Sequence, residues 1–174
     1  MYRYDSNNKV LEECAYSIDG KQLRTQTMYE YDEKGNLKSS SSKSLRENYV
    51  WRKDIYTYDE SGRLASHTNY SYKQDGSNDG KTITCYNEYG DIASKESFWS
   101  NMEVRSLLSC YEYDTYGSVV AEKKYDEEDK LFKDLKYTIT YDEHGNRLTY
   151  EQQQHIDEYS YYILGQRKYN ITYR

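Results

Sequence analysis

Tyr-Asp-Glu-Lys-Gly-Asn-Leu, residues 31–37, recurs along the chain with small changes. Later copies are YDESGRL (58–64), YNEYGDI (86–92), YDTYGSV (113–119) and YDEHGNRL (141–148), and a degenerate first copy is YDSNNKV (4–10). Their lead tyrosines are 27 or 28 residues apart throughout. Self-similarity at a fixed period of this length is typical of repeat architectures. The sequence therefore predicts a single β-repeat domain over residues 1–174, made of about six two-stranded units.

The residue order of the motif is that of a β-hairpin turn. Aspartate suits the first position of a type I turn, and glycine suits the fourth position, where φ is positive. Asn8 replaces this glycine in the first copy, and asparagine tolerates positive φ better than most residues. A type I turn closed by a glycine bulge is a common hairpin connection. The predicted cross-strand pairs are Tyr31 with Leu37, Tyr58 with Leu64, Tyr86 with Ile92, and Tyr113 with Val119.

The segments around these turns alternate with a period of two, as strands do. Residues two apart before the turns place Tyr29 with Tyr31 and Tyr56 with Tyr58, which predicts one tyrosine-rich face and one more polar face. The serine run 39–42 fits either a strand or a mobile loop. Further hairpin turns are predicted at Asp19-Gly20 and near Asn101, and Gly165 indicates another hairpin or a bulge. The extra Arg147 before Leu148 predicts a local bulge or register change in the last copy.

Composition restricts the type of sheet. Leu, Ile, Val and Phe make up only 26 residues, whereas there are 24 tyrosines. A sandwich needs two inner faces rich in aliphatic residues, which this chain cannot supply. We therefore expect an all-β fold, an extended open antiparallel meander of about twelve strands in which tyrosine is the main packing residue. A single twisted layer is compatible with this composition.

Charge and hydropathy exclude some classes of function. The net charge is −6, and Lys and Arg are scattered singly among acids, which argues against nucleic acid because phosphate binding needs clustered basic residues. No apolar run approaches the roughly 20 residues of a membrane span. A repeat follows Met1 at once, so no signal segment is expected within this chain.

The three cysteines are expected to be unpaired. Cys14, Cys85 and Cys110 show no metal-binding spacing. Cys85 and Cys110 fall in strands that another strand should separate, which places them about 10 Å apart, too far for a disulfide.

The repeated Tyr-x-Tyr-Asp-x-x-Gly-Asn/Arg-Leu pattern resembles the YD repeat of Rhs-type and teneurin-type proteins, and resembles still more closely uncharacterised secreted proteins of gut Bacteroidetes. The resemblance covers essentially the whole chain. It implies a secreted, periplasmic or cell-surface location. Large Rhs proteins wrap many such repeats into a shell around a toxin, and six units are too few for that.

One loop could bind a cation. Asp75, Ser77 and Asp79 follow the order that opens an EF-hand-like calcium loop, but Tyr86 stands where the bidentate glutamate is expected. A polar hairpin loop without a metal is the main expectation, and Ca²⁺ is the alternative. No other cofactor is expected.

The aromatic residues could form a ligand-binding face. Aromatic rings offer apolar planes with a polar rim on which sugar rings can stack, although the rings could equally cover one another. The candidate ligand-binding residues are Trp51, Tyr56, Tyr58, Phe98, Trp99, Tyr111 and Tyr113.

No catalytic residues are predicted. The turn aspartates recur because turns favour them, and His67, His144 and His155 lack metal-ligand spacing. The sequence favours a non-enzymatic extracellular or cell-envelope protein that acts as a scaffold or binding surface for a glycan or protein partner. The alternatives are a carbohydrate-binding module that uses the aromatic face, and a structural protein that assembles through its exposed sheet edges.

Overall fold

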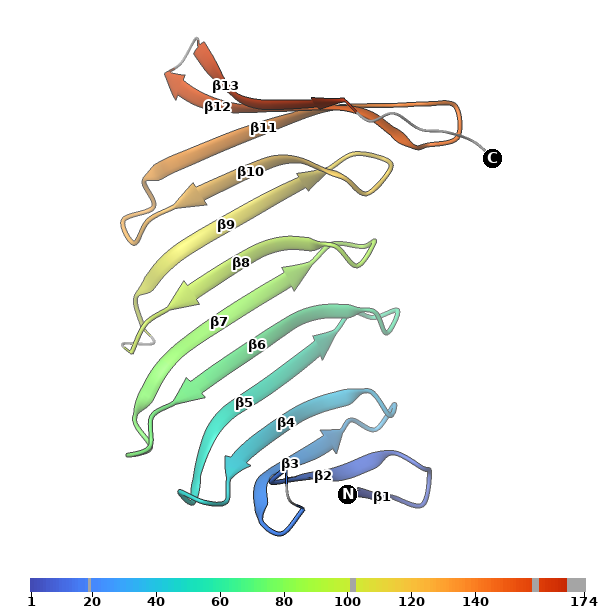
Figure 1. Cartoon of the computed structure of the whole chain (residues 1–174), viewed down its shortest axis with the longest axis vertical. Coiled ribbons are helices and arrows are strands. Elements are labelled where there is room, and N and C mark those ends of the chain that lie inside the picture. The colour runs from blue at the N-terminus through green and yellow to red at the C-terminus, as the bar shows by residue number, and fades with distance from the viewer. Residues whose placement is uncertain (19, 101–102, 158–159, 169–174) are drawn as a thin grey trace.

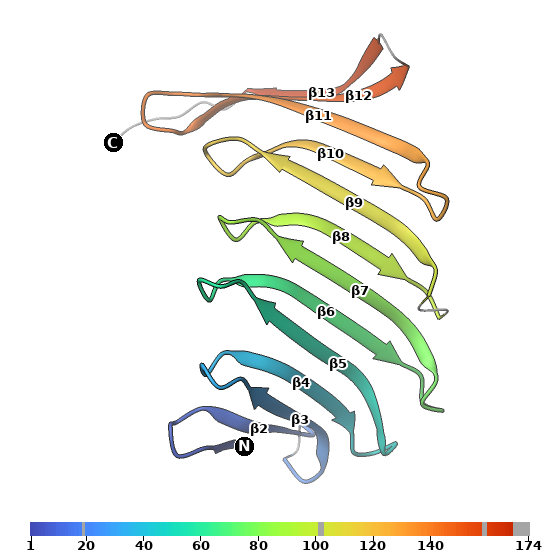
Figure 2. The same cartoon turned by 180° about the vertical axis from the view of Figure 1, so that it is seen from behind.

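The computed structural model describes residues 1–18, 20–100, 103–157 and 160–168, and this part of the chain is all-β. Thirteen strands form one sheet in chain order, each antiparallel to the next. The sheet is open, with β1 and β13 at its two ends (Figures 1 and 2). The predicted open antiparallel meander is confirmed, with one strand more than expected because the C-terminal segment adds β13.

The strands are β1 (Tyr2–Tyr4), β2 (Val10–Tyr16), β3 (Leu23–Tyr31), β4 (Leu37–Ser44), β5 (Tyr49–Tyr58), β6 (Leu64–Tyr72), β7 (Asn78–Tyr86), β8 (Ile92–Phe98), β9 (Arg105–Tyr113), β10 (Val119–Tyr125), β11 (Leu131–Tyr141), β12 (Arg147–Asp157) and β13 (Ser160–Lys168). The serine run lies in β4 and is therefore a strand. Gly165 lies at a register shift between β12 and β13, so the bulge is confirmed. The turn expected near Asn101 and residue Asp19 of the Asp19-Gly20 turn lie outside the described residues.

The six Tyr-Asp motifs form equivalent turns. In the second copy, the amide of Gly35 donates to the carbonyl of Asp32 at 2.9 Å, and the amide of Asp32 donates to the carbonyl of Asn36 at 2.9 Å. The carboxylate of Asp32 also accepts from the amide of Asn36 at 2.8 Å. Gly35 has a φ of 86° and Asn8, in the same place, 66°. This is the predicted type I turn with a bulge at positive φ.

All six turns lie at the same ends of the strands, on the right in Figure 1, and we call this side of the sheet the Tyr-Asp rim (residues 5–8, 32–35, 59–62, 87–90, 114–117 and 142–145). The side formed by the other connections is the opposite rim. The four predicted tyrosine–aliphatic pairs are confirmed by the strand registers.

Of the bulge or register change expected for the last copy, the bulge is present, between Thr140 and Tyr141, but the pairing offset does not differ from that of the other copies. Tyr141 pairs with Arg147 at the same offset as Tyr31 with Leu37. Arg147 takes the place of the aliphatic residue, and Leu148 takes the unpaired bulge position. Every copy already has a bulge at the residue that follows the partner of the lead tyrosine. The extra Arg147 therefore changes which side chain pairs with Tyr141 and leaves the turn geometry unchanged.

The lead tyrosines connect neighbouring hairpins through their hydroxyl groups. The hydroxyl of Tyr58 donates to the carbonyl of Leu37 at 2.9 Å, 21 residues earlier. Tyr31 and Tyr113 make the equivalent bonds to the carbonyls of Val10 and Ile92, both at 2.9 Å. A phenylalanine would leave these carbonyls without that donor, which accounts for tyrosine at these three lead positions.

The sheet has few buried apolar side chains. Those that are buried in the described part of the chain are Cys14, Ala121 and Leu135, and Leu135 is only 1% exposed. Polar side chains are buried as well, in particular Ser40, Asp54 and Ser109. Small polar residues can pack in the middle of a single layer because neighbouring strands cover them on both sides.

The three cysteines are free. Cys85 in β7 and Cys110 in β9 both pair with Ser94 in β8, which lies between them. The expected separation by one strand is therefore confirmed, and it accounts for the absence of a disulfide between them.

Candidate functional site

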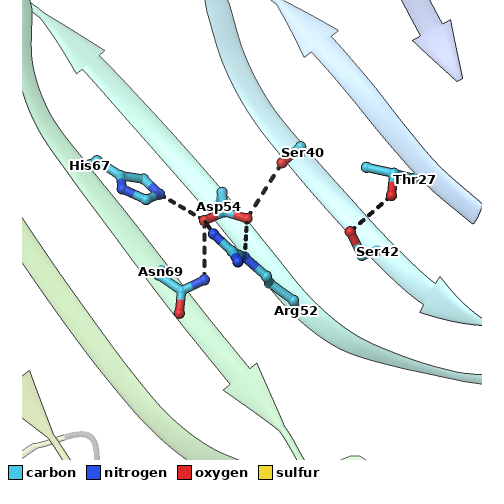
Figure 3. A network of polar contacts seen from close by, with 7 residues as sticks. All are labelled: Thr27, Ser40, Ser42, Arg52, Asp54, His67 and Asn69. Atoms are coloured by element: carbon cyan, nitrogen blue, oxygen red, sulfur yellow. Dashed lines mark hydrogen bonds and ion pairs between the residues drawn. The ribbon is translucent and has the colours of Figure 1, made fainter. Parts of the chain in front are cut away.

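A buried aspartate in β5 gathers five hydrogen-bond contacts from three adjacent strands (Figure 3). The Asp54 side chain is only 5% exposed, and the Arg52 guanidinium contacts both its oxygens at 2.7 and 2.9 Å. His67 Nε2 lies 2.7 Å from Oδ1. Asn69 donates its amide at 3.0 Å, and Ser40 its hydroxyl at 3.5 Å.

This polar cluster keeps the carboxylate charged. Burial by itself raises the pKa of Asp54, but hydrogen bonds from Arg52, His67 and Asn69 outweigh it, so the pKa lies below its ordinary value. The ring of Tyr56 stacks on the imidazole of His67, with centroids 4.7 Å apart and an interplanar angle of 6°. Stacking fixes the orientation of His67 and covers one side of the cluster.

The arrangement of the cluster fits a structural role. Both oxygens of Asp54 accept donors from the protein, so the carboxylate has little capacity left to bind or deprotonate a substrate. The residues instead join β4, β5 and β6 across the middle of the sheet. Sequence reasoning missed this cluster, although a signal was present. Counting back from the Tyr58–Leu64 pair across its bulge places Asp54 opposite Asn69, as the structure does.

The predicted aromatic residues do not form one surface. Tyr56 and Tyr58 line one groove at the Tyr-Asp rim, and Tyr111 and Tyr113 line another. Phe98 and Trp99 lie at the opposite rim, where they border a smaller hollow together with Asp79. Trp51 lies near the start of β5, unpaired between Val50 and Arg52.

The proposed calcium loop is partly a strand. β7 begins at Asn78, so Asp79 is in extended backbone, while the Asp75 carboxylate accepts from the amide of Ser77 at 2.8 Å. Within the described residues no group of three His, Cys, Asp or Glu side chains could hold a metal ion. The Ca²⁺ alternative stays a prediction.

The two grooves at the Tyr-Asp rim are equivalent by position in the repeat. The first groove, of about 400 Å³, lies between the second and third turns, and the second, of about 540 Å³, lies between the fourth and fifth. Corresponding residues line both: the first turn residue and the residue after the glycine from one repeat, then Tyr-x-Tyr-Asp and the turn glycine from the next. In the first groove these are Asp32, Asn36, Tyr56, Tyr58, Asp59 and Gly62, and in the second Asn87, Asp91, Tyr111, Tyr113, Asp114 and Gly117.

Side chains bridge the other three gaps between successive turns. Lys9 donates to the carbonyl of Gly35 at 2.7 Å across the first gap, and Arg63 donates to the carbonyl of Glu88 at 2.7 Å across the third. In the fifth gap Tyr116 stacks on Tyr141 at 4.2 Å. The type of residue that follows the turn glycine therefore affects whether a side chain bridges to the next turn. Lys9 and Arg63 bridge from this position, whereas Asn36 bonds back to Asp32 of its own turn at 3.1 Å.

The grooves carry negative charge at their borders. Hydrogen bonds from Ser61 and Arg63 hold the pKa of Asp59 far below its ordinary value. Burial by itself raises the pKa of Asp114, but hydrogen-bond donors that include the Tyr141 hydroxyl outweigh burial, so the pKa lies below its ordinary value. Burial, and then the nearby carboxylates Asp32 and Asp91, raise the pKa values of Tyr58 and Tyr113 respectively. The carboxylates of Asp59 and Asp114 are ionised and the phenols of Tyr58 and Tyr113 neutral at pH 7.

The part of the chain that the structure describes has no helix with the length and apolar character needed to cross a membrane. No protein-family model matches the chain, and no curated protein matches its sequence.

Several solved structures are similar to this chain. The crystal structure of TcdB2-TccC3 matches 92% of this chain and 10% of its own, at 14% identity and a TM-score of 0.33. The Tc holotoxin pore of Photorhabdus luminescens matches 87% of this chain and 12% of its own, at 11% identity and a TM-score of 0.20. A protein of unknown function from Bacteroides fragilis matches 95% of this chain and 96% of its own, at 12% identity and a TM-score of 0.23.

This chain thus spans about a tenth of the length of the toxin chains it matches. The resemblance to gut Bacteroidetes proteins stays a prediction that rests on the sequence motif.

Proposed function

We propose that this protein is a non-enzymatic β-repeat scaffold that binds a partner along its Tyr-Asp rim. The observation that supports this most is the recurrence of an open groove, with corresponding residues, at two places on the rim. Repeated equivalent sites on a rigid sheet suit the binding of an extended ligand. As part of the same proposal, and on the sequence resemblance alone, the protein acts outside the cytoplasm.

The Asp54 cluster supports the non-enzymatic part of the proposal. Its Asp54 carboxylate accepts hydrogen bonds from Arg52, His67 and Asn69. General acid or base catalysis needs a group that can reach a proton on the substrate. A carboxylate that is 5% exposed and holds several donors does not meet that need.

A carbohydrate-binding site at the opposite rim is a second candidate. Trp99 is 74% exposed beside Phe98, and an exposed indole next to a hollow of about 260 Å³ provides a surface on which a sugar ring can stack. This candidate uses a different part of the molecule, so variants separate it from the first.

Arrays of immobilised glycans and peptides test both candidates. We expect at least one array member to bind the wild type and to bind Glu33→Ala/Tyr89→Ala about tenfold more weakly, since Glu33 and Tyr89 line the two grooves. Trp51→Ala/Trp99→Ala, at the opposite rim, is the matched control and should bind like the wild type.

Binding that depends on Trp51 and Trp99 instead would establish the second candidate and refute the first. If no array member binds the wild type, the first candidate is refuted as well. Mass spectrometry of the array members after incubation should show them intact, and cleavage or modification of any of them would contradict a non-enzymatic role.

A further inference from the structure

The bridged gaps show what kind of chemical group the space between two turns accepts. Lys9 lies with its ammonium against Gly35, donates to the carbonyl of that residue at 2.7 Å, and lies 5.0 Å from the centre of the Tyr31 ring. The cation thus combines a carbonyl acceptor with the face of an aromatic ring, which attracts cations. Both partners belong to the repeat that follows Lys9.

Arg63 shows the same preference two repeats later. Its guanidinium donates to the carbonyl of Glu88 in the next turn at 2.7 Å and to the carboxylate of Asp59 at 2.9 Å. A basic side chain thus bridges two of the three closed gaps. At both places a carbonyl of the next turn binds the cation, so the acceptor for a cation recurs with the repeat.

The two open grooves have the same elements without the basic side chain. Tyr58 and Gly62 in the first groove correspond to Tyr31 and Gly35, as do Tyr113 and Gly117 in the second. A β-carbon built on Gly62 or Gly117 would meet no atom within 4 Å, and the same holds for Gly90 in the gap that Arg63 bridges, whereas one built on Gly35 would meet the Lys9 side chain. Asn36 and Asp91 stand at the positions of Lys9 and Arg63 and carry no positive charge.

Charge favours a cationic occupant. Asp91 and Asp114 line the second groove, and no basic residue lines it. The first groove has the acids Asp32, Glu33 and Asp59 and the bases Lys34 and Lys38. The whole chain carries a net charge of −6. The second groove should therefore bind a cation more tightly than the first.

We propose that the two open grooves are equivalent binding sites for the basic side chains of an extended partner peptide, each side chain occupying the place that Lys9 takes in the first gap. This inference rests on the proposed function of the Tyr-Asp rim and names the partner chemistry. The grooves are separated by four strands, or about 19 Å at ordinary strand spacing. An extended peptide covers that distance in about six residues.

A fluorescent peptide tests the proposal. The probe has lysines six residues apart in a Gly/Ser/Thr background, and its control has norleucine at both positions. Fluorescence anisotropy should show about tenfold weaker binding of the norleucine peptide. A peptide with the lysines two residues apart cannot reach both grooves and should also bind more weakly. Raised salt should weaken binding of the lysine probe.

Filling the grooves from within should prevent binding. Asn36→Lys/Asp91→Lys supplies each groove with the basic residue that Lys9 and Arg63 supply elsewhere, and should reduce affinity for the probe about tenfold or more. The matched control Asn78→Lys/Glu128→Lys changes the net charge equally at the opposite rim and should reduce it less than about twofold. Equal losses in both variants would mean attraction to net charge alone and would overturn the proposal.

Amide chemical shifts provide a second readout that uses the wild type only. Titration with the lysine probe should shift the amides of Gly62 and Gly117, and should leave those of Gly35 and Gly145, which side chains already cover, in place. Equal binding of the norleucine peptide, or shifts confined to other residues, would overturn the proposal. If the rim binds only neutral glycans on the arrays, the proposed function stands and this inference fails.

Discussion

At the scale of single residues, the lead tyrosines do more than fill space. Tyr31, Tyr58 and Tyr113 each combine a ring that packs on the sheet with a hydroxyl that reaches the preceding hairpin. A net contribution of about 1 kcal/mol is typical of one such hydrogen bond. Because the bond recurs from repeat to repeat, its contribution adds along the sheet.

Tyr58→Phe should therefore lower the free energy of unfolding by about 1 kcal/mol. The reason is that the carbonyl of Leu37 loses its donor while the packing of the ring is kept. Urea denaturation measures the change. Tyr89→Phe is the control, since the Tyr89 side chain is 82% exposed, and it should have no effect. Equal effects at both positions would show that the hydroxyl bond is not the cause.

Asp54 should make stability depend on pH. Its pKa in the folded protein lies below the ordinary value of 3.8, so its contribution is fully present above that value and is lost as the pH falls through the folded pKa. Asp54→Asn should lower the free energy of unfolding by about 2 kcal/mol at pH 7, and the difference from the wild type should shrink below about pH 4.

Thermal unfolding between pH 2.5 and 7 measures this dependence. Glu33→Gln, at an exposed turn position, provides the control and should follow the wild type throughout. If the difference between Asp54→Asn and the wild type stays constant down to the lowest pH, ionisation of Asp54 does not stabilise the cluster.

At the scale of elements, the turn glycine determines whether a hairpin closes. Gly62 has a φ of 85°, a backbone conformation that residues other than glycine, asparagine and aspartate rarely adopt. A β-carbon added at Gly62 would meet no atom within 4 Å, so the backbone conformation alone sets the cost of a substitution. The occurrence of Asn8 and Asp129 at positive φ shows which replacements the turns tolerate.

Gly62→Ala should destabilise the protein by about 1 kcal/mol, while Gly62→Asn should cost less. Gly165→Ala is the matched control, because Gly165 also has open space around it and does not have positive φ. Chemical denaturation of the three variants checks the order. A cost for Gly165→Ala as large as that for Gly62→Ala would point away from φ as the cause.

At the scale of the whole molecule, each strand contacts only its neighbours in sequence within the residues that the structure describes. Such a sheet is quasi-one-dimensional, and its stability is approximately a sum over units and the interfaces between them. The length of the protein can therefore change by whole periods without a change of fold.

Deletion of residues 87–113 removes one period and joins Tyr86 directly to the turn at Asp114. The shortened protein should fold, with a urea m-value about one sixth smaller because less surface is exposed on unfolding. Circular dichroism and urea denaturation measure both properties. Deletion of residues 87–99 leaves β7 and β9, which run in the same direction, joined by a connection too short for a parallel crossover, and should not fold. Folding of both proteins to the same extent would contradict the repeat-unit view.

The sequence by itself determined the fold class, the period, the turns and the register of this protein. These features are local, because an Asp-x-x-Gly turn fixes the pairing of its own two strands, as Tyr31 with Leu37 shows. The shortage of aliphatic residues determined that the sheet is open. Arg147 shows the limit of that reasoning. The number of residues in the motif does not reveal that Arg147 pairs with Tyr141 while Leu148 takes the bulge position.

Only the tertiary structure decided which residues from different hairpins meet. The convergence of Ser40, Asp54 and His67 depends on the registers of two successive strand pairs. The separation of Trp99 from the rim tyrosines depends on the end of the sheet at which each turn lies. Whether a groove is open depends on where a side chain such as Lys9 reaches in the next repeat. Such contacts arise between units, and no pattern within one unit specifies them.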